Sequence, residues 1–171
     1  MLNPLQWWSK HLSLHLRNAE PADTVYLMQI DIKCYDNAWE SEEWRQVAMN
    51  RSQNVICVTR HSLPIAYAVY EVEPNQLKLL RIGVSPKYRR NRIGTSMLKW
   101  IDRLMDDRGI RRATCIVPIN QTGSANFLKS GGWRVPPKGG IVKDAFEDCG
   151  ELIEGLYFIR DKSPALLEDE S

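Results

Sequence analysis

A short basic run, Arg89 to Thr95, separates an apolar segment from an amphipathic one and has the features of an anion site. The apolar segment is Leu79 to Val84, and apolar periodicity resumes at Ile93, where it predicts a helix. The first amides of a helix have no partners within it, and they carry the positive end of the helix dipole. Arginine adds forked donors that suit phosphate oxygens, and Gly94 lets an anion approach the backbone closely. The run therefore predicts a phosphate-binding turn.

Residues 88–98, YRRNRIGTSML, resemble the acetyl-CoA pyrophosphate loop of the GNAT superfamily of N-acetyltransferases. The family's usual pattern is Arg/Gln-x-x-Gly-x-Gly/Ala, in which Arg89 fills the first position and Gly94 the last. Arg92 stands where the family usually has its first glycine. We expect arginine to occupy that position only if its backbone torsion is not strongly left-handed, with a slightly reshaped loop or an outward Arg92 side chain. The alternative is an ordinary basic turn before an amphipathic helix.

Residues 120–133, NQTGSANFLKSGGW, resemble a second motif of the same family. There the family has an asparagine after its fifth strand, then a short helix, a Phe/Tyr-Leu/Tyr pair and a Gly-Phe. Asn120, Phe127-Leu128 and Gly132-Trp133 match it, with about one extra residue in the helix. Residues 34–44, CYDNAWESEEW, look like the acidic–aromatic connection between the first two helices of the ribosomal-protein N-terminal acetyltransferase subgroup. The whole resemblance covers roughly residues 14–160.

This resemblance implies acetyl-CoA as cosubstrate. It implies that a β-strand edge at residues 82–84 pairs with the strand-like pantetheine arm, with the Val84 N–H aimed at the thioester oxygen. Residues 90–95 would hold the pyrophosphate, Asn120 would hydrogen-bond the pantetheine arm, and Phe127 would pack against the cofactor. A plain core strand is the alternative reading of residues 82–84, and both readings can hold because the cofactor role uses the backbone. The expected cofactor-binding residues are Ile82, Gly83, Val84, Arg89, Arg90, Asn91, Arg92, Ile93, Gly94, Thr95, Asn120 and Phe127.

The catalytic groups are harder to assign. Acetyl transfer to an amine needs a neutral amine, a stabilised carbonyl oxygen and a leaving thiolate. Related N-terminal acetyltransferases use a glutamate or histidine on the fifth strand as base, where this chain has Cys115, and a tyrosine in the asparagine helix as acid, where it has Leu128. A buried strand thiol is the commoner role for a residue such as Cys115. The candidate catalytic residues are Cys115, Glu71 and Tyr157, followed by Glu73, Tyr67 and Tyr70.

Amine chemistry limits the acceptor. An α-amine with a pKa near 7.8 is roughly one quarter neutral at pH 7.4, whereas a lysine amine near 10.4 is only ~0.1% neutral. A missing strong base therefore favours α-amines, another amine of low pKa, or lost activity. The leading hypothesis is an acetyl-CoA-dependent N-acetyltransferase that acts on a protein or peptide amine by direct attack in a ternary complex. The alternatives are a small-molecule amine acetyltransferase and a catalytically inactive binding module with the same fold.

Composition excludes several other classes of protein. The chain has 171 residues, of which 43% are hydrophobic and 26% charged, as in an ordinary soluble domain. A net charge of +2 is too small to indicate nucleic-acid binding, and no apolar run is long enough to span a bilayer or to form a secretory signal. The four cysteines lack CxxC spacing or a regular framework, which predicts a reducing, cytoplasmic setting. His11 and His15 have no evident third ligand, so no metal site is expected. The expected partners are a protein or peptide N-terminus or a small amine, with the protein as monomer or homodimer.

The order of predicted elements is β-α-α-β-β-β-α-β-α-β, which indicates an α/β fold with helices on both faces of a mixed, mostly antiparallel sheet of six to seven strands. The predicted domain covers residues 1–162, and residues 163–171 form an acidic tail that we expect to be disordered. We expect Ser41 to cap the second helix, a turn at residues 61–64 and a long loop at residues 135–151. The resemblance implies that the fourth and fifth strands splay apart. Strands are expected at residues 12–16, 54–60, 65–72, 77–84, 112–119 and 152–160, and helices at 25–35, 41–50, 93–108 and after Asn120.

Overall fold

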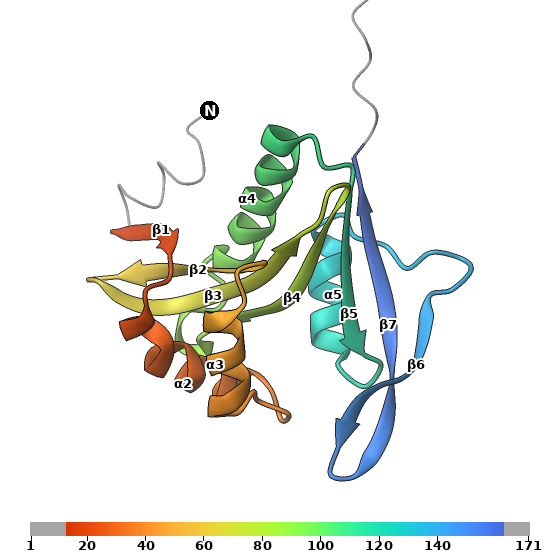
Figure 1. The fold of residues 1–171 in the computed structure, drawn as a ribbon, viewed down its shortest axis with the longest axis horizontal. Helices are drawn as coiled ribbons and strands as arrows, with labels where there is room; N and C mark the ends of the chain where they lie inside the picture. The colour runs from red at the N-terminus through yellow and green to blue at the C-terminus, as the bar shows by residue number, and fades with distance from the viewer. Residues whose placement is uncertain (1–12, 163–171) are drawn as a thin grey trace, which may run out of the picture. The chain divides into compact units, whose positions relative to one another are not determined.

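The computed structural model describes residues 13–162 (Figure 1). The described residues form two compact units, one of residues 13–72 and 79–101 and the other of residues 73–78 and 102–162. Strand β4 (Gln76–Val84) and helix α4 (Ile93–Arg108) each contribute residues to both units. The expected acidic tail, residues 163–171, lies outside the described residues, as does Leu12 of the first predicted strand.

The first unit contains an antiparallel meander. Strand β1 (Leu14–Asn18) pairs with β2 (Gln53–Arg60), and β2 pairs with β3 (Leu63–Val72). The β2–β3 turn is shorter than expected, because Leu63 and Pro64 already belong to β3. His61 and Ser62 alone make the turn, with φ of 48° and 67°. Two consecutive left-handed residues give the tight turn whose twist matches that of the flanking strands, so the four-residue turn predicted from sequence was wrong.

Helices cover both faces of this part of the sheet. Helix α2 (Thr24–Cys34) follows the short 3₁₀ turn η1 (Pro21–Asp23), and α3 (Ser41–Met49) comes next. Leu27 and Trp44 from these helices pack against Tyr67 of β3 in one buried cluster. Tyr70 of β3 packs edge-on against Trp100 of α4, with ring centroids 5.7 Å apart, and Figure 1 shows α4 on the face opposite α2 and α3. The expectation of helices on both faces is confirmed here.

The start of α3 differs from the expectation in its cap. Glu40 occupies the N-cap position, and Ser41 is the first helical residue. The Glu40 amide donates to the Glu43 carboxylate at 2.8 Å. A glutamate three residues into the helix can satisfy the N-cap amide in this way, and its charge also complements the helix dipole. The sequence identified the helix correctly and its cap wrongly.

The second unit continues the sheet. Strand β5 (Arg112–Pro118) pairs in parallel with Gln76–Lys78 of β4, and β7 (Glu151–Asp161) pairs antiparallel with β5. Strand β6 (Ile141–Asp148) pairs with β7 at the outer edge, and α5 (Thr122–Ser130) follows β5. The order of the sheet is β1-β2-β3-β4-β5-β7-β6. The predicted class, a mixed and mostly antiparallel sheet of six to seven strands, is confirmed with seven.

Strand β6 corrects the sequence analysis, which predicted a loop over residues 135–151. The pairing of β6 with β7 is interrupted between Val142 and Phe146, and Asp144 has a φ of 50°. This β-bulge breaks the two-residue alternation by which a strand is recognised in a sequence. Gly155 of β7 lies against the bulge, where an added Cβ would come within 2.9 Å of the Ala145 Cβ.

The remaining boundaries agree closely with the sequence. Helix α4 has the predicted bounds and ends at Gly109, whose φ of 65° is a normal C-terminal cap. Among the helices of residues 13–162, none combines the length and apolar character needed to span a bilayer.

Candidate functional site

The predicted phosphate-binding turn lies in the first unit, between β4 and α4. The chain leaves β4 at Val84 and passes through the 3₁₀ turn η2 (Pro86–Tyr88). The Ser85 amide donates to the Ile65 carbonyl of β3 at 2.9 Å, and the Tyr88 amide donates to the Ser85 carbonyl at 2.8 Å. These two bonds attach the start of the turn to the sheet.

The amides of residues 90–95 are available as a group. The Ser96 amide makes the first bond of α4, to the Arg92 carbonyl at 3.0 Å, and no amide of residues 90–95 donates to another described residue. Arg90 has a φ of 65° and Arg92 a φ of 58°, whereas Asn91 between them is outside the left-handed region. Backbone that alternates in this way turns successive N–H groups toward one concave side, which is a common anion-binding arrangement. The turn therefore presents both a nest of amides and the N-terminus of a helix sixteen residues long.

The torsion of Arg92 contradicts the sequence-based expectation. We expected arginine at this glycine position only without a strongly left-handed backbone, yet the backbone is left-handed at both Arg90 and Arg92. A non-glycine residue in this region costs about 1–2 kcal/mol, and such strain persists only where the surrounding structure enforces it. The turn thus keeps a glycine-type conformation while it gains two exposed guanidinium groups. No Asp or Glu occurs in residues 74–101, so the local charge is strongly positive.

The end of β4 offers a strand edge next to this turn. Because Ser85 bonds to β3, and backbone groups of alternate residues point to opposite edges, Ile82 and Val84 direct theirs away from β3. The Tyr35 hydroxyl donates to the Ile82 carbonyl. The Val84 carbonyl accepts from the Cys34 thiol at 3.3 Å and from Arg89 Nε at 3.2 Å. Side chains therefore donate hydrogen bonds to the carbonyls of this edge. The amides of Ile82 and Val84 point in the same direction and are possible donors.

A buried ion pair holds the connection between α2 and α3 beside this edge. The Asp31 side chain is fully buried and accepts from Arg81 Nε at 2.7 Å and from Nη2 at 3.0 Å. It also accepts from the Tyr67 hydroxyl and from the Trp39 amide at 2.6 Å. Every lone pair of the carboxylate faces a donor, which is the condition under which a buried charge is tolerated. Burial raises the pKa of Tyr67, so its hydroxyl remains a hydrogen-bond donor.

Two aromatic rings enclose the guanidinium of Arg81. Its Cζ lies 4.0 Å from the Tyr35 ring centroid and 4.9 Å from that of Trp39. Its Nη2 also donates to the Asn37 carbonyl at 2.9 Å. These cation–π contacts and hydrogen bonds fix the connection at both of its ends. Tyr35 is thereby held next to Ile82.

Sequence reasoning missed the ion pair of Asp31 and Arg81. Asp31 lies in the apolar stripe of α2, four residues after Leu27 and next to Ile30, all of them buried. A carboxylate at such a position requires a buried cation, and that requirement was the signal available in the sequence. The partner could not be identified from sequence alone, because Arg81 is fifty residues away along the chain.

The three proposed catalytic residues have environments of different kinds. Burial raises the pKa of the Cys115 thiol to about 12, so the group stays protonated at neutral pH and does not suit a general base. Glu71, at the far end of β3, accepts a hydrogen bond from the Ser52 hydroxyl at 2.7 Å. It is six residues from Ile65, or about 20 Å along the strand from the contact with Ser85. Tyr157 is half-buried on β7, opposite Ile116 of β5.

The further catalytic candidates are engaged elsewhere. Glu73 forms an ion pair with Lys78, and the Lys78 and Gln76 side chains hold the pKa of its carboxyl below the usual value. Tyr67 bonds to Asp31, and Tyr70 packs on Trp100. The sequence therefore offered several oxygen groups, and the structure engages these three in an ion pair, a hydrogen bond and an aromatic contact, respectively.

The asparagine helix lies in the second unit. Asn120 is exposed just before α5, and Phe127 is half-buried on the helix. Leu128, at the position of the family's usual acid, is buried with 2% exposure. It contributes only apolar contact there. The expected contacts of Asn120 and Phe127 with a cofactor stay predictions.

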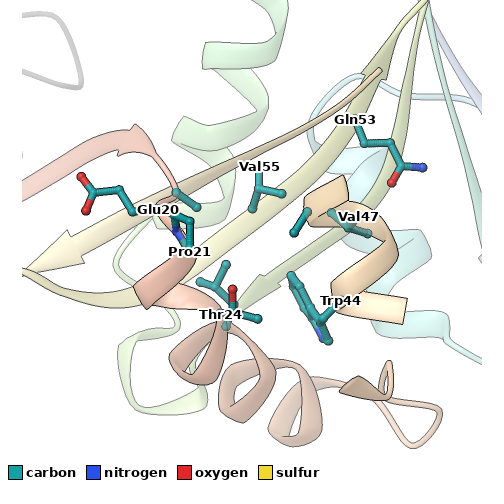
Figure 2. A pocket seen from close by; sticks show the side chains of 10 residues that line it. Glu20, Pro21, Thr24, Trp44, Val47, Gln53 and Val55 are labelled. Atoms are coloured by element: carbon teal, nitrogen blue, oxygen red, sulfur yellow. The ribbon is translucent and has the colours of Figure 1, made fainter. Parts of the chain in front are cut away.

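A separate surface pocket of about 240 Å³ lies in the first unit between η1, α2, α3 and β2 (Figure 2). Its lining includes apolar residues such as Leu27, Trp44 and Val55, and its polar members are Glu20, Thr24 and Gln53. None of the predicted site residues lines it. The candidate site is therefore the turn and strand edge described above.

Comparison with known proteins agrees with the family resemblance of the sequence motifs. The model of the "Acetyltransferase (GNAT) family" matches residues 24–133, which is more than half of the chain. A search of curated proteins gave no match. Solved structures with a similar fold include the ribosomal-protein-S18-alanine N-acetyltransferase of Escherichia coli, with 15% identity and a TM-score of 0.77 over 91% of this chain and 97% of that one.

Two further structures are similar. Arabidopsis thaliana NAA60, solved in complex with a bisubstrate analogue, has 14% identity and a TM-score of 0.75 over 88% of this chain and 99% of that one. A spermidine N-acetyltransferase chimera from Vibrio cholerae and hSSAT has 13% identity and a TM-score of 0.67 over 86% and 95%. At these identities the structures bear on the fold alone, whereas the family model also covers the turn and the strand edge. The chain belongs to the acetyltransferase (GNAT) family.

Proposed function

We propose that the chain is an acetyl-CoA-dependent N-acetyltransferase that acetylates a protein or peptide amine, with α-amines as its preferred class, by direct attack in a ternary complex. The observation that carries the proposal is the run of amides at residues 90–95, which donate to no other described residue and alternate in backbone conformation. That arrangement fits a diphosphate, because fixed donors and guanidinium groups converge where no carboxylate competes.

The residues of the first unit suit two parts of the cosubstrate, its pyrophosphate and its pantetheine arm. The amides of residues 90–95, with Arg90 and Arg92, would hold the pyrophosphate. The amides of Ile82 and Val84 would pair with the pantetheine arm, since a strand edge accepts an extended chain through main-chain bonds. When bound, the cosubstrate supplies an activated acetyl group as a thioester. The protein supplies orientation and fixed donors for the developing negative charge.

The absence of an evident strong base supports an amine of low pKa. Burial keeps Cys115 protonated, and Glu73 is held in an ion pair. An acceptor that is already partly neutral at physiological pH needs no strong base, and α-amines meet that condition far better than lysine amines. The structural neighbours include a ribosomal-protein alanine acetyltransferase and a spermidine acetyltransferase, so the substrate panel must include peptides and polyamines.

A cytoplasmic setting is part of this proposal. Cys34, Cys57, Cys115 and Cys149 are all free thiols. Secreted domains of this size commonly use cysteines in disulfides, so free thiols support a reducing compartment.

Isothermal titration of the full chain with acetyl-CoA tests the cofactor half. We expect binding by the wild type, a clear loss with Gly94→Glu and a weaker loss with Arg90→Ala, because the first introduces bulk and negative charge at the helix N-terminus. No binding by the wild type would reject the proposal.

Free-thiol release in the presence of different amines tests the acceptor half. The panel is a peptide with a free N-terminus, the same peptide with a blocked N-terminus and an internal lysine, and spermidine. Faster turnover on the first peptide supports the α-amine preference, and turnover on spermidine alone supports the small-molecule alternative.

A non-catalytic binding module is the second candidate. The observation that favours it is the pair of apolar or neutral groups, Cys115 and Leu128, at the positions of the family's base and acid. Tight binding of acetyl-CoA without turnover on any amine of the panel would support this candidate over the first.

A further inference from the structure

Two cations meet at one aromatic ring beside the phosphate-binding turn. The Arg60 Cζ lies 5.8 Å from the Tyr88 ring centroid, and the Lys87 Nζ lies at the same distance from it. Arg60 is the last residue of β2, whereas Lys87 and Tyr88 belong to η2, directly before Arg89. We call these three residues the Tyr88 cluster. It brings positive charge from a separate strand to the start of the turn.

No acidic side chain in the described part of the chain neutralises this cluster. Arg17 and Arg81 each form a close pair with an aspartate, but neither Arg60 nor Lys87 has an ion-pair partner within residues 13–162. The Nε of Arg60 is buried and has no hydrogen-bond partner among those residues. A buried charged donor without an acceptor is costly, so the cluster has the character of a site that requires an anion.

The charges of the turn indicate which anion this is. A pyrophosphate diester carries two negative charges, which the amides of residues 90–95 and the guanidinium groups of Arg90 and Arg92 can offset. Arg89 is directed to the Val84 carbonyl and the Cys34 thiol, so Arg60 and Lys87 remain as a second pair of cations. A phosphomonoester carries about −1.5 to −2 at neutral pH, which matches two cations. Coenzyme A has one such group, the 3′-phosphate on its adenosine ribose.

We propose that Arg60 and Lys87, held against Tyr88, bind the 3′-phosphate of coenzyme A and so distinguish it from 3′-dephospho-coenzyme A. The inference rests on the proposed function, because it concerns the same cosubstrate. It assigns to the end of β2 a role in selecting the cofactor, in addition to its role in the sheet. The pyrophosphate and pantetheine contacts would be common to both ligands, so the difference between their affinities isolates the Tyr88 cluster.

Isothermal titration of the full chain with coenzyme A and with 3′-dephospho-coenzyme A tests the proposal. The variants are Arg60→Gln and Lys87→Gln, and Arg51→Gln is the matched control, since it removes the same charge from an exposed turn of the same unit. We expect the wild type to bind coenzyme A about tenfold more tightly than the dephospho form, the gain of roughly one charge-assisted contact. Arg60→Gln and Lys87→Gln should each remove most of this ratio by weakening coenzyme A alone, and Arg51→Gln should leave it unchanged.

Equal affinity of the wild type for the two ligands would overturn the inference and leave the proposed function standing. Equal loss of both ligands in Arg60→Gln and in Lys87→Gln would also overturn it, because the residues would then act on the turn as a whole. If the wild type binds neither ligand, the proposed function fails and the inference fails with it. Lys87 is exposed, so Lys87→Gln keeps the test decisive if Arg60→Gln does not fold. Thermal unfolding of each variant identifies that case.

Discussion

Asp31 on α2 and Arg81 on β4 form a buried, two-point ion pair that joins the helical layer to the strand next to the predicted phosphate-binding turn. The aspartate is fully buried and the arginine side chain is 8% exposed. Burial alone would lower the pKa of Arg81, but the hydrogen bonds and the charge of Asp31 outweigh it, and the pKa lies above its ordinary value. The Arg81 guanidinium is therefore charged at neutral pH.

The first prediction concerns this pair. Asp31→Ala leaves the buried Arg81 guanidinium without its negatively charged partner, so it should lower the free energy of unfolding by about 3–5 kcal/mol. The double variant Asp31→Leu with Arg81→Leu removes both charges and should lose clearly less than the single variant. Urea unfolding followed by tryptophan fluorescence measures both. Arg45→Met, which breaks an exposed pair with Glu42, is the control and should have no measurable effect. A double variant with a lower free energy of unfolding than Asp31→Ala would contradict the assignment of the loss to an unpaired buried charge.

The second prediction concerns the strained turn. Arg92→Gly releases a left-handed residue with a cost of about 1–2 kcal/mol, against a loss of about 0.4–1 kcal/mol from the more flexible unfolded chain. The free energy of unfolding should therefore rise, by up to about 1.6 kcal/mol. Arg89→Gly is the matched control, because Arg89 has a φ of −62° and no such strain, and it should destabilise the protein. Thermal and urea unfolding decide between the two signs. The same sign for both variants would contradict strain at Arg92.

The third prediction concerns Gly83 on β4. An added Cβ would lie 2.7 Å from Cε1 of Tyr67, whose ring is buried and whose hydroxyl is tied to Asp31. Gly83→Ala should therefore destabilise the protein by about 1–3 kcal/mol, the usual cost of overpacking. Gly123→Ala on α5 is the control, because nothing lies within 4 Å of its added Cβ. That variant should be neutral or gain about 0.4–1 kcal/mol. Unfolding midpoints in urea compare the two.

The fourth prediction concerns pH. Burial raises the pKa of Cys115 from its ordinary value of 9.0 to about 12 in the folded protein. Above pH 9 the unfolded state loses this proton first, so the folded state binds more protons and stability falls as pH rises from about 9 toward 12. Below about pH 9 the thiol is protonated in both the folded and the unfolded state, so its contribution to stability is fully present. Cys115→Ala should therefore show a shallower loss of stability between pH 9 and pH 10.5 than the wild type, measured by urea unfolding at each pH.

The same variant tests the role of the thiol in catalysis. A thiol that stays protonated cannot accept a proton from the amine at neutral pH, so Cys115→Ala should keep kcat within a few-fold of the wild type. A loss of a hundredfold or more with an intact fold would restore Cys115 as a catalytic residue.

The success of the sequence-based predictions depended on how local each signal was. Helix α4 was bounded correctly because its apolar period and its terminal Gly109 are both read within one segment. The turn at residues 90–95 was located for the same reason, and its phosphate-binding role stays a prediction. The family match confirms the expected class of enzyme, an N-acetyltransferase, and its cosubstrate acetyl-CoA. The torsion of Arg92 was not predictable, because the surrounding fold enforces a conformation that the residue itself disfavours.

Long-range contacts accounted for most of what the sequence left open. Asp31 with Arg81, and Arg60 with Tyr88, are pairs whose members lie far apart in the chain. Strand β6 escaped prediction because the bulge at Asp144 hides its alternation. The catalytic assignments to Glu71 and Tyr157 stay predictions. In each case the missing information was tertiary, since sheet pairing and burial decide what a side chain contacts.

The Ser85 amide bond to Ile65 and the Ser96 amide bond to Arg92 hold the two ends of the turn that contains the left-handed residues Arg90 and Arg92. A turn held in this way has little backbone freedom to lose, so association with an anion should cost little backbone entropy. The turn is therefore preorganised for the anion that it would bind.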